Sequence, residues 1–184
     1  IQKRVTVFIK EPDVDFCYAA SSTRDDDGNE LGAMGAPWPL ENDARIAKYL
    51  FNTNSPMMKR AQCAKAGPWR EDDLHGQEHE YFSRIKFYSN KVVFIDQMLS
   101  VYIKHEKDHI LNVSKEFSLA LFRVLLMVKS LVLYSVHDKY SERHELSMEF
   151  RHVAKLLYRA GDYSNASLAL EETLVLKKSV KVYA

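Results

Sequence analysis

The chain has 184 residues, which is long enough for one domain with an appendage and for a substantial hydrophobic core. Apolar residues make up 46% and charged residues 28%, as in an ordinary soluble globular protein. The net charge of +1 argues against any polyanion partner bound through bulk charge. The two cysteines, Cys17 and Cys63, are too few for a disulfide framework or a cysteine metal site, so a reducing compartment is expected.

Residues 1–40 lack the pattern of a folded domain. The segment Lys3–Lys10 alternates enough to form a short strand, but no second strand follows for it to pair with. An acidic run at Asp25–Asp27 and a stretch of small residues at Gly32–Ala36 come next. We therefore expect an extended N-terminal arm that is ordered by lying on a partner chain. Its aromatic anchors would be Phe16, Tyr18 and Trp38.

Residues 41–184 are predicted to form an all-α domain of six or seven helices, arranged as antiparallel hairpins in an α-solenoid or repeat-like bundle. Asn42 or Asp43 can cap a first helix, and Pro56 can begin a second one that ends near Lys65. A long helix is expected over residues 78–104, because apolar side chains recur there every three or four positions. That stripe consists of Phe82, Ile85, Tyr88, Val92, Ile95, Leu99 and Tyr102.

The segment 114–137 is the most apolar part of the chain, and its length would allow it to span a membrane. Arg123 and Lys129 oppose a span, because each costs roughly 2.5–3.5 kcal/mol near a bilayer centre. The polar residues of this segment share one arc of a helical wheel, and the remaining circumference is apolar. This pattern predicts the central helix of a water-soluble bundle without a membrane span.

The segment 148–178 has the pattern of a helical hairpin. Apolar residues fall at i, i+3, i+4 and i+7 in its first half, beginning at Phe150. Gly161 can adopt the left-handed conformation that ends a helix, and Asp162 can cap the next one. The second half repeats the apolar pattern from Tyr163 onward.

This hairpin resembles one unit of a tetratricopeptide repeat, and the related pentatricopeptide repeats share the same architecture. The resemblance covers about thirty of the 184 residues. It implies a scaffold of stacked helix pairs whose surface holds another protein. The residues expected to pack the two helices together are Phe150, Ala154, Leu157, Gly161, Tyr163, Ala166 and Leu170.

One motif suggests catalysis: His105-Glu106-Lys107-Asp108-His109 has the form H-E-x-x-H, in which two histidines one helical turn apart hold zinc. The charged residues around it and the lack of a third ligand in the next six residues favour a solvated helix junction instead. Three further histidines, at positions 137, 144 and 152, are interpreted as exposed polar residues. We find neither a glycine-rich phosphate loop nor a G-x-S-x-G nucleophile motif in the sequence.

These observations predict a non-catalytic accessory subunit or scaffold of a larger assembly, with other protein subunits as partners and no cofactor. Because the sequence begins at Ile1, a processed mitochondrial protein is expected, for example a subunit of ATP synthase. The alternatives are an RNA-binding helical-repeat protein and a zinc-dependent hydrolase that uses His105 and His109. A nucleic-acid partner is disfavoured because basic and acidic residues are interspersed.

Overall fold

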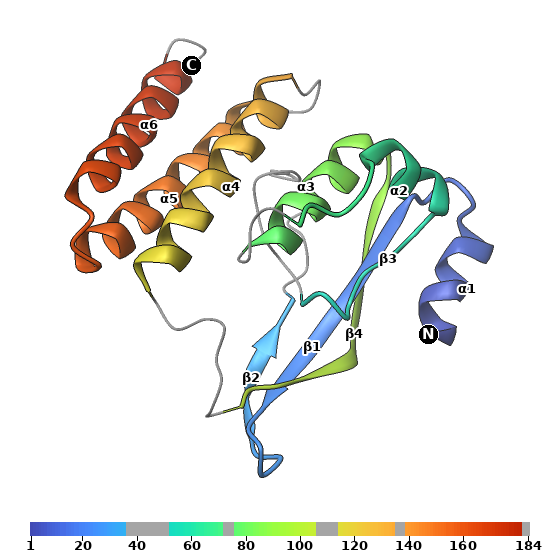
Figure 1. Cartoon of the computed structure of the whole chain (residues 1–184). Coiled ribbons are helices and arrows are strands. Elements are labelled where there is room, and N and C mark those ends of the chain that lie inside the picture. The colour runs from blue at the N-terminus through green and yellow to red at the C-terminus, as the bar shows by residue number, and fades with distance from the viewer. Residues whose placement is uncertain (36–51, 72–75, 106–113, 135–138, 182–184) are drawn as a thin grey trace. The chain divides into compact units, whose positions relative to one another are not determined.

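The computed structural model describes residues 1–35, 52–71, 76–105, 114–134 and 139–181. The chain divides into two compact units (Figure 1). The sheet unit contains α1 (Gln2–Lys10), β1 (Phe16–Arg24), β2 (Glu30–Met34), β3 (Met57–Met58), α2 (Arg60–Ala66) and β4 (Val92–Ile103). The helical unit contains nearly all of α3 (Gln77–Tyr88), together with α4 (Lys115–Tyr134), α5 (Lys139–Arg159) and α6 (Tyr163–Lys181). The fold is therefore mixed α/β, and the prediction of an all-α solenoid is wrong.

β1 is the central strand of the sheet. β4 pairs with it in parallel, in a register that runs from Phe16 opposite Val92 to Arg24 opposite Ile103. β3 pairs antiparallel with the start of β1, at Phe16 and Cys17, and β2 pairs antiparallel with residues 21–24. Since β4 occupies one edge of β1, the strands β2 and β3 lie one after the other along its second edge.

The burial of β1 corrects the prediction of an extended N-terminal arm. Phe16 and Tyr18, which were expected to anchor a partner, are both 0% exposed. Tyr18 packs on Phe94 of β4, with ring centroids 5.1 Å apart. Because the N-terminal segment packs on its own chain, the argument for a partner from an ordered arm loses its support. Trp38 and the predicted first helix, at residues 42–51, lie outside the described residues.

Three predicted elements differ from the observed ones. Lys3–Lys10 belongs to helix α1 instead of a strand, and the helix predicted from Pro56 begins only at Arg60, because Met57–Met58 forms β3. The helix expected over 78–104 ends at Tyr88, and the strand β4 follows it. Register shifts opposite β1 insert extra residues into β4. These bulges interrupt the two-residue alternation that would have identified a strand.

The helical unit confirms the helix predicted over 114–137, as α4, and the helical hairpin predicted over 148–178, as α5 and α6. α5 lies between α4 and α6 (Figure 1). The three helices share one core, in which Phe122 of α4 meets Phe150 of α5 edge to face, with ring centroids 6.0 Å apart. Val128, Leu146 and Leu157 are 0% exposed within it.

By length and composition alone, α4 could cross a membrane, since its mean hydropathy is 1.9. The core helix of a soluble protein passes the same test, and several residues of α4 lie in the shared core. Lys129 on α4 donates to the Glu172 carboxylate of α6 at 2.5 Å, so this charge is paired within the unit. This arrangement agrees with a bundle helix, and the lack of a membrane span stays a prediction.

Candidate functional site

The turn between α5 and α6 fixes the geometry of the hairpin. Gly161 has a φ angle of 78°, and its N–H donates to the carbonyl oxygen of Tyr158 at 3.1 Å. The N–H of Asp162 donates to the carbonyl oxygen of Leu157 at 2.9 Å, which completes a Schellman motif. The Asp162 carboxylate then accepts from the backbone N–H of Asn165 at 3.3 Å and caps α6. The turn predicted from Gly161 and Asp162 is thus confirmed.

Apart from Gly161, which forms the turn, the residues expected to pack the hairpin divide into two groups. Four are buried between the helices: Phe150, Ala154, Leu157 and Ala166. Tyr163 and Leu170 are instead 64% and 49% exposed. Some of the regularly spaced apolar residues of α6 therefore lie on the surface, where they do not contribute to the packing of α5 on α6.

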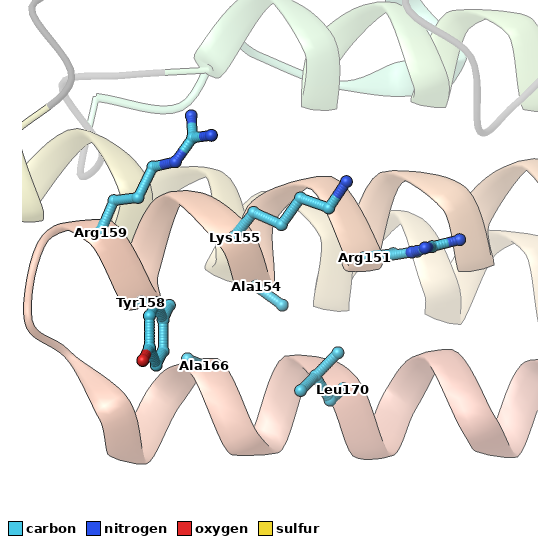
Figure 2. A pocket seen from close by; sticks show the side chains of 7 residues that line it. All are labelled: Arg151, Ala154, Lys155, Tyr158, Arg159, Ala166 and Leu170. Carbon is cyan, nitrogen blue, oxygen red and sulfur yellow. The ribbon is translucent and has the colours of Figure 1, made fainter.

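A groove of about 240 Å³ opens between α5 and α6 on this surface (Figure 2). Ala154, Ala166 and Leu170 make an apolar floor, and Tyr158 stands at the end nearest the turn. The Tyr158 ring contacts that of Tyr163, with centroids 5.2 Å apart and planes at 65°. Small-molecule sites typically enclose about 300–1,000 Å³. The groove therefore has room for one or two side chains of a partner and is small for a cofactor.

Three cations line the α5 side of the groove: Arg151, Lys155 and Arg159. All three are exposed, and Lys155 and Arg159 extend away from α6 (Figure 2). They follow each other at intervals of four residues, so their Cα atoms are about 6 Å apart along one flank of α5. Among the described residues none of the three side chains has an ion-pair or hydrogen-bond partner, whereas Lys129 of α4 is paired with Glu172.

An exposed apolar stripe on α6 extends the groove. Tyr163, Leu170 and Leu174 are 64%, 49% and 56% exposed. Together with Ala166 they fall within an arc of about 80° on the helix, at about 100° per residue. Leu168, which is 47% exposed, lies about 120° from Leu174, on the other flank of the same helix. The groove and the stripe form one surface, which we call the hairpin face.

The predicted zinc motif is only partly described. His105 is exposed, and its Nδ1 pairs with the carboxylate of Asp26 in the sheet unit. Glu106 and His109 lie outside the described residues. Groups of three or more potential metal ligands are not found within the described ranges. His144 and His152 lie on the surface of α5, and His137 is also outside the described residues.

The helical unit also buries two opposite charges that the sequence did not reveal. Lys86 of α3 and Glu142 of α5 are 1% and 0% exposed. Burial lowers the pKa of the Lys86 ammonium from 10.5 to about 7, while the nearby Glu142 charge opposes this shift. A lysine with a lowered pKa can act as a nucleophile where substrate reaches it. Because both side chains are enclosed, we assign them to the core of the unit.

Comparisons with known proteins identify no relative of this chain. The sequence matches no family model, and searches of curated proteins and of solved structures give no significant match. The resemblance to helical repeats therefore stays a prediction that concerns one hairpin.

The site residues predicted from the sequence belong mainly to the hairpin core and do not include the cations on its flank. The spacing of four between Arg151, Lys155 and Arg159 was visible in the sequence. This spacing indicates a cationic surface only when the flank of α5 that α4 and α6 leave uncovered is known. Charge spacing on a helix identifies a surface only after the buried face has been assigned.

Proposed function

We propose that this chain is a non-catalytic interaction protein, an accessory subunit or scaffold that binds another protein through the hairpin face. The observation that supports this proposal most directly is the apolar surface left open beside a groove of side-chain size. Tyr158 and Tyr163 are 65% and 64% exposed, and Leu174 is 56% exposed. Contiguous exposed apolar surface of this kind is typical of protein-interaction sites.

The composition of the hairpin face also suits a protein partner. Tyrosine and arginine are enriched among the residues that dominate binding energy at protein interfaces. Tyrosine contributes a large contact area while losing little conformational freedom on binding. A standard interface buries about 800 Å² on each partner, so the groove alone is too small and the α6 stripe must take part.

Membership of a mitochondrial assembly stays a prediction, and so do the RNA-binding and zinc-hydrolase alternatives. Among the described residues the groove lining contains no carboxylate or histidine that could hold zinc. Its cations would attract RNA, but its apolar floor offers little to phosphates and sugars. We therefore rank protein binding first.

The proposal is tested by gentle affinity purification of the tagged full chain from its native source, followed by mass spectrometry. Leu174→Asp places a charge in the α6 stripe, and Leu168→Asp makes the same change on the opposite flank of α6. Both leucines are about half exposed, so neither change should unfold the hairpin.

We expect Leu174→Asp to reduce recovery of a stoichiometric partner on the order of tenfold or more, because a desolvated charge would face the partner. Leu168→Asp should retain the partner. Equal recovery by both variants would place the binding surface elsewhere. A wild-type chain recovered without any stoichiometric protein would contradict the proposal.

A further inference from the structure

We propose that the segment bound at the hairpin face is acidic, with aspartate or glutamate residues flanking one large apolar side chain. This inference rests on the proposed function and specifies the chemistry of the partner. The apolar side chain enters the groove between α5 and α6. Its acidic neighbours reach the cations of α5.

Charge complementarity supports this choice. Arg151, Lys155 and Arg159 are exposed along one flank, and none has an ion-pair partner among the described residues. The described lining of the groove contains three cations and no carboxylate. Arginine forks bind carboxylates in a bidentate manner, and lysine supplies a point charge between the two arginines. Carboxylates at every second residue of an extended segment, about 7 Å apart, match the roughly 6 Å spacing of the cations.

The floor of the groove indicates which apolar side chain of the bound segment can enter it. Ala154 and Ala166 have small side chains that leave space between the helices, and Leu170 completes the apolar floor. A leucine or phenylalanine entering this space would bury apolar surface against both helices. Tyr158, beside the opening, would cover the inserted side chain.

A nucleic acid would also be attracted by the cations, but the rest of the surface suits it poorly. Base stacking requires an accessible aromatic face. The rings of Tyr158 and Tyr163 are exposed, but they meet each other at 65° with centroids 5.2 Å apart, so they do not offer parallel faces to successive bases. Phosphates and sugars would gain little from the leucines of the α6 stripe. The observations therefore favour an acidic peptide segment over RNA.

The test is a selection of short random peptides displayed with both ends joined to their carrier, using the purified full chain as target. A parallel selection uses a random single-stranded RNA library. The comparison variant changes Arg151, Lys155 and Arg159 to glutamine, which removes charge and keeps side-chain length. A control variant carries Lys10→Gln and Lys65→Gln, two exposed cations of the sheet unit.

Peptides enriched on the wild-type chain should contain acidic residues around one leucine or phenylalanine. The triple variant should bind an individual enriched peptide on the order of tenfold more weakly, since it loses three exposed ion pairs with the peptide. The control variant should bind it unchanged. Added salt should weaken binding to the wild type.

Three results would overturn the inference: enriched peptides without acidic residues, equal binding by the triple variant, or enrichment of RNA without any acidic peptide. The outcomes also separate this inference from the proposed function. If Leu174→Asp abolishes capture of the native partner while the triple variant captures it fully, the hairpin face binds protein and the acidic chemistry is wrong. If neither variant affects capture, both proposals fail.

Discussion

Replacing Lys86 by methionine is expected to destabilise the helical unit strongly, although methionine is apolar and similar in length. Lys86 and Glu142 are 1% and 0% exposed, so at about pH 6, below the Lys86 pKa of about 7, the substitution leaves a carboxylate buried without its counter-charge. Removal of one partner of a buried ion pair costs about 3–5 kcal/mol. The double variant Lys86→Met/Glu142→Met places two apolar side chains together. It should recover most of this loss or exceed the wild-type stability, by up to about 4 kcal/mol.

The pH dependence gives an independent check on the same pair. The pKa of Lys86 is lowered to about 7 in the folded chain, chiefly by burial, against 10.5 in the unfolded chain. Between these values the unfolded chain binds a proton that the folded chain has released, so the unfolding free energy rises with pH across this window. The wild type should gain stability between about pH 7 and 10 relative to Lys86→Met, in which this contribution is absent.

Urea denaturation followed by circular dichroism measures these effects, and amide hydrogen exchange of α5 assigns them to the helical unit. For a desolvated pair, the effects of Lys86→Met and Glu142→Met should be strongly non-additive in the double variant. If each single change cost less than about 1 kcal/mol and the two effects simply added, Lys86 and Glu142 would not be a desolvated pair.

Two further predictions concern the turn and the sheet. Gly161→Ala should lower the unfolding free energy by about 1–2 kcal/mol, because φ is 78° while an added Cβ meets no atom within 4 Å, so that only backbone strain acts. Gly161→Asn should cost less in the same urea titration, since asparagine tolerates this conformation better. Burial raises the pKa of the Cys17 thiol to about 11, so iodoacetamide at neutral pH should modify only the half-buried Cys63, as judged by mass spectrometry. Modification of native Cys17 at a comparable rate would show that β1 is not the enclosed central strand.

The hairpin was predictable because its signals are local. The helical periodicity, a glycine that ends α5 and an aspartate that caps α6 lie within about thirty residues. Each has a direct physical cause in backbone geometry, seen in the φ of 78° at Gly161 and the hydrogen bonds of Asp162. Even so, the pattern did not distinguish core from surface at Tyr163 and Leu170, because exposed apolar residues continue the same helical spacing.

The sheet could not be predicted because its determinants are non-local. β1 contains small and polar residues, such as Ala19 and Ser21, yet it is buried because β4 pairs with it from some 75 residues further along the chain. Most of its residues are buried in succession, so the strand shows no alternation of apolar and polar residues. In β4, the register shifts place apolar residues three and four positions apart instead of two. This spacing favoured a helical interpretation, although the β-branched residues of the segment are typical of a strand.

The buried Lys86 shows a third limit of the sequence. A lysine between isoleucine and phenylalanine on an amphipathic helix is ordinarily exposed, and its burial depends on Glu142 of another helix. A single sequence does not contain this pairing in any local pattern.

The most direct test of the account is cross-linking of the native assembly, with mass spectrometry of the peptides joined to Lys155. This lysine is exposed beside the groove, so a partner on the hairpin face should place a cross-linkable group near it. We predict cross-links from Lys155 to acidic segments of another protein, and their loss in Leu174→Asp. A chain that sediments alone in native extract, with Lys155 joined to no other protein, would contradict the account.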